Sequence, residues 1–205
     1  NDADIDALLE EADQIRRTQK IATTNESADI PNDPWRSLGE RDEIDVIIRS
    51  TCEKHEDVGL ILVGVDNMRD LNREAGTKTG DLAMRRAAES IVRACKEAAG
   101  ESAEVYRFVG AEMAVVLRGP IANASITLAE RIRVAVRLSP LSDESIGMRA
   151  LTASIGVATM GPTSGPSTPD ELVRAAMVAL SEARRRGGDA VADSNDPEIN
   201  ERMAA

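Results

Sequence analysis

Seven residues between two apolar stretches contain the groups of this chain best suited to chemistry. Residues 107–113 read RFVGAEM, so an arginine and a glutamate lie on either side of a glycine. A glutamate carboxylate is the hard oxygen ligand that Mg²⁺ prefers, and a glycine lets the backbone turn tightly and approach a phosphate closely. The flanking segments, residues 103–108 and 112–117, predict the two strands of a hairpin around this turn.

Other side chains with reactive or metal-binding chemistry are scarce. His55 is the only histidine, and Cys52 and Cys95 form neither a metal-binding nor a redox motif. This pattern argues against a zinc site. Two isolated cysteines predict buried thiols in a reducing cytoplasm, and their sequence leaves a disulfide between them open.

The composition limits the partners that the chain can bind. A formal net charge of −11 over 205 residues disfavours nucleic acid and anionic membrane surfaces, because both require clustered Lys and Arg. Small nucleotides stay possible, since a few local basic residues are enough to bind them. The longest apolar run, Val58–Val65, is too short to span a bilayer. The first residue is Asn1 rather than Met, so we expect the soluble part of a longer protein.

The chain is predicted to contain one domain with an appendage at each end. Residues 1–32 read as a helix over 3–20 followed by a polar linker, residues 33–193 as the globular domain, and residues 194–205 as a tail. The first helix is either a solvated terminal helix or a connecting, dimerising helix, and its length does not decide between them.

Within the domain, apolar periodicity predicts alternating helices and strands. The turn at residues 76–80 should separate two helices, and Thr168 should cap the last helix. The predicted helices are residues 40–55, 67–75, 81–98, 122–138 and 169–186, and the predicted strands are residues 58–65, 103–108, 112–117, 148–159 and 190–192. This order predicts an α/β fold with helices packed on a sheet.

Six segments in the right order and spacing resemble the GGDEF family of diguanylate cyclases. Residues 107–113 resemble its signature hairpin, Arg-(Tyr/Phe)-Gly-Gly-(Asp/Glu)-Glu-Phe. The other five are residues 33–41 (DPWRSLGER), 64–72 (GVDNMRDLN), 76–81 (GTKTGD), 152–158 (TASIGVA) and 179–187 (ALSEARRRG). The resemblance implies a palm-type nucleotidyl cyclase fold, with a central, mostly antiparallel sheet flanked by helices and here preceded by an N-terminal helix.

The same resemblance implies that the metal site is lost. In the family, two subunits that each hold GTP make cyclic di-GMP with two Mg²⁺ ions, and the acids that hold these ions correspond to Gly64 and Ala111. Asp66 lies roughly 6.5 Å further along the strand, outside the tolerance of a metal ligand. Glu112 alone cannot form the pair, and Val109 places a β-branched side chain where the family has its first glycine. We therefore expect no Mg²⁺ site and no catalytic residues.

A vestigial nucleotide pocket is also implied by the resemblance. Asn72 and Asp81 would contact the guanine edge, whose donors and acceptors suit an amide and a carboxylate. Arg69 and Arg184 stand where the family places phosphate-binding lysines. The full set of candidate residues is Arg69, Asn72, Asp81, Gly110, Glu112 and Arg184. Structural alternatives are a solvated helix position for Asn72, an N-cap for Asp81, and a solvated basic face for the arginines.

The inhibitory product site of the family, Arg-x-x-Asp, corresponds to Gly100 and Ala103, so tight product binding is not expected. The sequence is best interpreted as a catalytically inactive GGDEF-like module that acts through a protein partner or a homodimer, with no cofactor. One alternative is a guanine-nucleotide sensor with GTP in the vestigial pocket, and another is an active cyclase with unusual ligands. A purely structural role is the remaining possibility.

Overall fold

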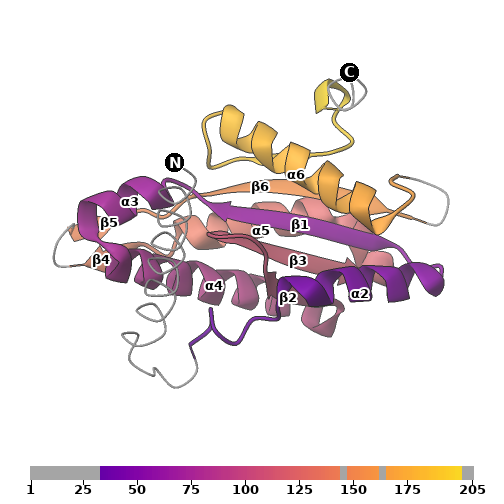
Figure 1. Cartoon of the computed structure of the whole chain (residues 1–205), viewed down its shortest axis with the longest axis horizontal. Helices are drawn as coiled ribbons and strands as arrows, with labels where there is room; N and C mark the ends of the chain where they lie inside the picture. Colours follow the sequence, from indigo (N-terminus) through magenta and orange to yellow (C-terminus); the bar gives the residue numbers. More distant parts are fainter. Residues whose placement is uncertain (1–32, 144–146, 162–164, 200–205) are drawn as a thin grey trace, which may run out of the picture. The chain divides into compact units, whose positions relative to one another are not determined.

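The computed structural model describes residues 33–143, 147–161 and 165–199 (Figure 1). The predicted N-terminal helix lies outside the described residues, as does the last part of the predicted tail. Every helix within these three ranges is too short or too polar to cross a bilayer.

A five-stranded sheet lies at the centre of the domain, in the order β2-β3-β1-β6-β7. Antiparallel pairing joins β2, β3, β1 and β6, and β7 is added parallel to β6. The mostly antiparallel sheet flanked by helices confirms the predicted fold. The strands are β1 (Val58–Val65), β2 (Ala103–Arg107), β3 (Glu112–Arg118), β6 (Ala153–Met160) and β7 (Val191–Asp193).

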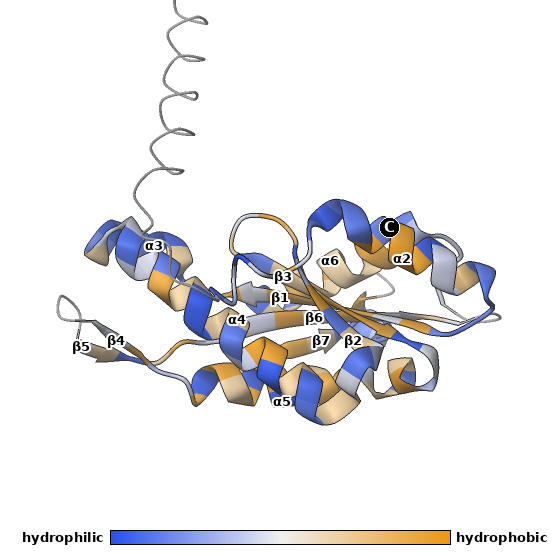
Figure 2. Cartoon of the chain, turned by 90° about the horizontal axis from the view of Figure 1, so that it is seen from below, coloured by the Kyte–Doolittle hydropathy of each residue, from blue (hydrophilic) through white to orange (hydrophobic). Residues whose placement is uncertain are grey.

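Helices cover both faces of this sheet. The helices are α2 (Arg41–Glu53), α3 (Met68–Ala75), α4 (Thr77–Ala99), α5 (Ser125–Arg137) and α6 (Pro169–Arg185). In Figure 2, α4 and α5 lie on one side of the strands and α2 and α6 on the other. Along β1, Ile61 and Val63 pack in the core with α4 and α5, whereas Leu60 and Leu62 pack in the core with α2 and α6. A strand buried on both faces requires the continuous apolar run that the sequence shows.

The junction between α3 and α4 differs from the prediction. The turn expected at residues 76–80 is reduced to Gly76, which has a φ of 83° and donates its N–H to the Asn72 carbonyl at 3.0 Å. Because glycine tolerates positive φ, one residue ends α3 and α4 begins at once at Thr77. Asp81 therefore lies in the second turn of α4, and its predicted role as an N-cap is wrong.

Two further element boundaries also differ. The predicted strand at residues 148–159 is split, because β5 (Gly147–Arg149) pairs with β4 (Leu141–Asp143) in a separate hairpin and β6 starts only at Ala153. Residues Gly119–Ala124 form a short 3₁₀ helix, η2, so the helix predicted at residues 122–138 starts at Ser125. The predicted cap at Thr168 is confirmed by its hydroxyl, which accepts the Glu171 N–H at 3.2 Å.

The first residues after β7 pack back onto the domain. The Ser194 N–H donates to the Val157 carbonyl at 2.8 Å, and Ile199 is buried against Ala179 and Ala183 of α6. Arg186, at the end of α6, forms an ion pair with Asp196 at 2.9 Å. These contacts attach residues 194–199 to the end of the helix that carries Arg184.

Candidate functional site

The predicted site residues of the hairpin lie at one end of the three central strands of the sheet, β3, β1 and β6. Gly64, at the end of β1, is the cross-strand partner of Glu112 in β3 and of Ser154 in β6. Cross-strand partners have Cβ positions about 5 Å apart, so side chains from Gly64 and Glu112 would share one small volume. We call this region the hairpin corner: Gly64, residues 109–112 and Arg184.

The turn of the hairpin is intact. The Glu112 N–H donates to the Val109 carbonyl at 3.0 Å, and the Val65 N–H donates to the Ala111 carbonyl at 3.3 Å. Gly110 has a φ of 57°, a backbone conformation that glycine adopts without steric cost. Val109 is 61% exposed, so its bulk lies on the outside of the turn.

Arg184, from the last turn of α6, fills the space above Gly64. Its guanidinium forms an ion pair with Glu112 at 2.8 Å. A Cβ added to Gly64 would lie 3.1 Å from Cζ of Arg184 and closer still to its Nη2 atom, too close for both groups to keep their places. The absence of a side chain at residue 64 is therefore what admits the guanidinium.

This arrangement does not suit a divalent cation. The Glu112 carboxylate already forms an ion pair with the Arg184 guanidinium, whose positive charge would repel a metal ion placed beside it. Across the three described ranges, no group of three or more His, Cys, Asp or Glu side chains is arranged to hold a metal ion. The residues at this corner do not fit the Mg²⁺ pair that the family resemblance implies.

Asp66, the residue directly after β1, has a different role. Its carboxylate accepts the Ser154 hydroxyl at 2.7 Å and the Asp189 N–H at 3.0 Å. Both carboxylate oxygens are thus used to attach the loop after α6 to the ends of β1 and β6. Asp66 therefore has a structural role at this position, holding the loop after α6 beside β1 and β6.

The loop after Arg184 is held from a second side by α5. The Asp189 carboxylate accepts Nη1 of Arg133 at 2.9 Å and Nη1 of Arg137 at 3.1 Å. Hydrogen bonds to Glu130 and then to Asp189 raise the pKa of Arg133, which keeps this clamp charged. Sequence reasoning missed the clamp, because no local motif marks contacts between residues more than 50 positions apart.

The predicted guanine-contacting residues lie at the α3–α4 corner, which comprises Arg69, Asn72, Gly80 and Asp81. The Asn72 side chain packs on Gly80, where an added Cβ would lie 2.9 Å from Cγ of Asn72. Asn72 and Asp81 are both exposed, one in α3 and the other directly after Gly80 in α4. Arg69 is also exposed and forms no ion pair with any described residue. Their nucleotide-binding roles stay a prediction.

Residues 40–190 match the family model described as the diguanylate cyclase GGDEF domain. This chain belongs to the GGDEF family. It is 28% identical over 140 residues to Diguanylate cyclase A of Treponema denticola, a match that covers 68% of this chain and 36% of that protein. It is 29% identical over 130 residues to Diguanylate cyclase DosC of Escherichia coli K12, covering 63% and 27% respectively. The chain thus spans about a third or less of the length of these curated relatives.

Solved structures show the same fold. The coiled coil and GGDEF domain of DgcB from Caulobacter crescentus, in complex with c-di-GMP, superposes with a TM-score of 0.67 at 24% identity, covering 94% of this chain and 98% of that one. Diguanylate cyclase SiaD from Pseudomonas aeruginosa, in complex with its activator SiaC, superposes with a TM-score of 0.69 at 22% identity, covering 92% and 70% respectively.

The positions of the family's product site carry no charged side chain in this GGDEF domain. Gly100 ends α4 with a φ of 57°, and Ala103 is the first residue of β2. Nearby, the Glu104 carboxylate accepts the Tyr106 hydroxyl and pairs with Arg118. Burial, and then the bond to Glu104, raise the pKa of Tyr106, so this hydroxyl stays protonated.

Proposed function

We propose that this GGDEF domain is a catalytically inactive regulatory or protein-interaction module. The observation that carries the proposal is the Arg184 guanidinium above Gly64, in an ion pair with Glu112. Two-metal catalysis requires hard oxygen ligands arranged around each Mg²⁺ at about 2.0–2.1 Å. Within the described residues, the hairpin corner supplies one carboxylate, and that carboxylate already neutralises an arginine.

The test is product formation from GTP. The full chain is incubated with GTP and either Mg²⁺ or Mn²⁺, and the mixture is analysed for cyclic di-GMP by mass spectrometry, with an active diguanylate cyclase as positive control. We expect no product above the level without protein. Product that accumulates in proportion to protein concentration would overturn the proposal.

A protein partner or a second copy is the proposed mode of action. The SiaD structure, which has this fold, contains a bound activator protein, so a GGDEF-containing chain can act through protein contacts. The helices α2, α4, α5 and α6 are buried against the sheet on one face each. This packing supports a rigid domain whose outer surface has a defined shape that a partner can bind. The proposed module needs neither a metal nor another cofactor.

Metal-independent nucleotide sensing is the second candidate. It is favoured by the exposure of Asn72, Asp81 and Arg69 at the α3–α4 corner. None of these three residues belongs to the hairpin corner, so the ion pair there does not involve them. Thermal unfolding with GTP, with and without Mg²⁺, and with cyclic di-GMP tests it. Ligand at a hundred times its dissociation constant adds about 2.7 kcal/mol to the free energy of unfolding. A metal-independent GTP shift lost in Asp81→Ala but kept in Glu89→Ala, an exposed acid of the same helix, would establish the sensor.

A further inference from the structure

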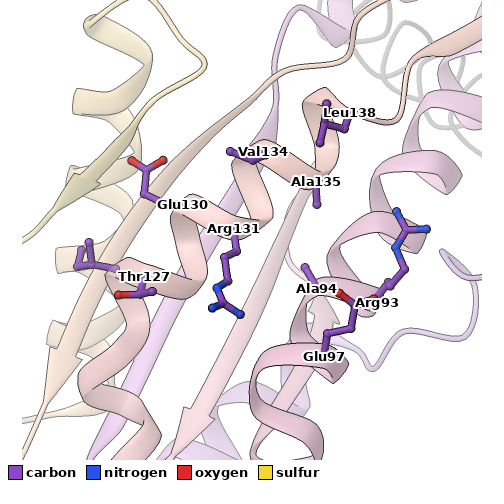
Figure 3. A pocket seen from close by; sticks show the side chains of 10 residues that line it. Arg93, Ala94, Glu97, Thr127, Glu130, Arg131, Val134, Ala135 and Leu138 are labelled. Atoms are coloured by element: carbon purple, nitrogen blue, oxygen red, sulfur yellow. The ribbon is translucent and has the colours of Figure 1, made fainter.

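An apolar groove runs between α4 and α5 on the side of these helices that faces away from the sheet (Figure 3). Its volume is about 780 Å³. Ala94 of α4 and Ala135 of α5 lie on its inner side, and the small size of alanine leaves room between the two helices. The groove is far from the hairpin corner in sequence and shares no residue with it.

Three large apolar side chains are exposed along this groove, two from α5 and one from the residue that directly follows it. Leu138 is 75% exposed, Val134 is 44% exposed and Ile126 is 38% exposed. Val134 and Leu138 are one helical turn apart and Ile126 is two turns before Val134, so all three lie on the same side of α5. Single exposed apolar residues are ordinary, but a row of three beside a groove is typical of a binding surface.

Most charged side chains that line the groove form no ion pair with another described residue. Glu130 forms an ion pair with Arg133 at 2.9 Å. Arg93 of α4 and Arg131 of α5 are exposed on the two walls and form no ion pair with any described residue, and the same is true of Glu97. The unpaired charges of the groove are therefore two guanidiniums and one carboxylate. They give the groove a small excess of positive charge, although the chain has a net charge of −11.

We propose that this groove binds an amphipathic α-helix of a partner protein, with an apolar stripe and acidic residues on both sides of it. The proposal rests on the proposed interaction function and names its surface. A third helix fits because two helices form the walls, and helices pack ridge into groove. Ile126 and Leu138 are about 18 Å apart along the axis of α5, which corresponds to about three turns of a bound helix. Acidic flanks would pair with Arg93 and Arg131.

A second copy of this chain is a poorer occupant. Each copy presents the same concave groove, and two concave surfaces do not fill one another. Both copies also carry a net charge of −11, which opposes their association. The oligomeric state is therefore measured as part of the test.

The probe is a designed 14-residue helical peptide with leucines at positions 2, 5, 9 and 12 and glutamates on both sides of the stripe. A matched peptide has lysine in place of each glutamate. Fluorescence anisotropy of each labelled peptide is measured against the full chain at low and high salt. We expect saturable binding of the glutamate peptide, at least about tenfold weaker binding of the lysine peptide, and weakening by salt.

Protein variants locate the binding. Val134→Glu should weaken binding of the glutamate peptide at least about tenfold, because it places a charge in the apolar groove. Arg93→Glu combined with Arg131→Glu should reverse the preference toward the lysine peptide. Met177→Glu is the matched control, since Met177 is 49% exposed on α6, on the other side of the sheet. Circular dichroism melts show whether each variant is folded.

Equal binding of both peptides, no binding of either, or binding that folded Val134→Glu does not change would overturn the inference. A dimer in sedimentation that Val134→Glu dissociates would also overturn it, because a second copy would then occupy the groove. Cyclic di-GMP formation in the activity assay would instead refute the proposed inactive module and leave the peptide result unaffected.

Discussion

The hairpin corner and the α3–α4 corner of this domain have changed to different extents relative to the family pattern. At the hairpin corner, the positions that the resemblance assigns to the two acids are Gly64 and Ala111, and Arg184 occupies the space above Gly64. At the α3–α4 corner, Asn72 and Asp81 match the family residues and remain exposed. The two corners share no residue, so we expect a change at one corner to leave the other in place. The proposed loss of the metal site would thus be a local change of charge and packing within an unchanged fold.

The largest effect is expected from converting the hairpin corner back to an acidic one. Gly64→Asp alone should bind a metal ion only weakly, because the flexible end of Arg184 can shift and pair with the new carboxylate. Gly64→Asp, Ala111→Asp and Arg184→Ala together remove the competing cation and add two ligands. This triple variant should bind Mn²⁺ at least about tenfold more tightly than the single variant. Isothermal titration measures both affinities, and tighter binding by the single variant would refute the role given to Arg184.

The second prediction compares how much the sheet and the hairpin corner each contribute to the free energy of unfolding. Leu62→Ala leaves a cavity in a fully buried strand and should lower the free energy of unfolding by about 2–5 kcal/mol. Arg184→Ala removes a partly exposed ion pair and should cost less than about 1 kcal/mol. Urea unfolding of the two variants provides the comparison. Equal losses would mean that the hairpin corner supports the fold, contrary to the independence described above.

A smaller loss is expected from Asp66→Ala, which leaves the Ser154 hydroxyl and the Asp189 N–H without their acceptor. An unpaired, partly buried polar group costs about 1–3 kcal/mol in the free energy of unfolding. Asp66→Asn retains one carbonyl acceptor and should lose less. If Asp66→Ala unfolds at the same urea concentration as the parent protein, Asp66 does not anchor the loop that follows Arg184.

The smallest effect concerns acid stability at the end of α6. Hydrogen bonds from Arg185 and then Arg186 lower the pKa of Glu182 from 4.5 to about 2. The folded state therefore binds this proton less readily than the unfolded state, so the contribution is present above pH 4.5 and is lost as the pH falls toward 2. Glu182→Gln should flatten the fall of the melting temperature in this range. An unchanged slope in the variant would show that Glu182 does not contribute to acid sensitivity.

The sequence by itself determined the features of this protein that are set by residues close together in the chain: strands, helix caps and turns. The apolar run at Val58–Val65 predicted β1 with its observed bounds, and Thr168 with Glu171 predicted the start of α6. The segment at residues 107–113 predicted a tight hairpin turn at Gly110, which has a φ of 57° in the structure. Each of these signals is contained within a few residues, because strands, caps and turns are decided by local periodicity and backbone preference.

Only the tertiary structure decided what fills the space that the missing acids leave. Arg184 and Glu112 are separated by 72 residues, and Asp66 and Asp189 by 123. The sequence showed only that residue 64 has no side chain. The fold places the Arg184 guanidinium, from the end of α6, over Gly64. The groove between α4 and α5 likewise arises only when two helices far apart in sequence pack together. Contacts of this kind depend on topology, which no single segment specifies.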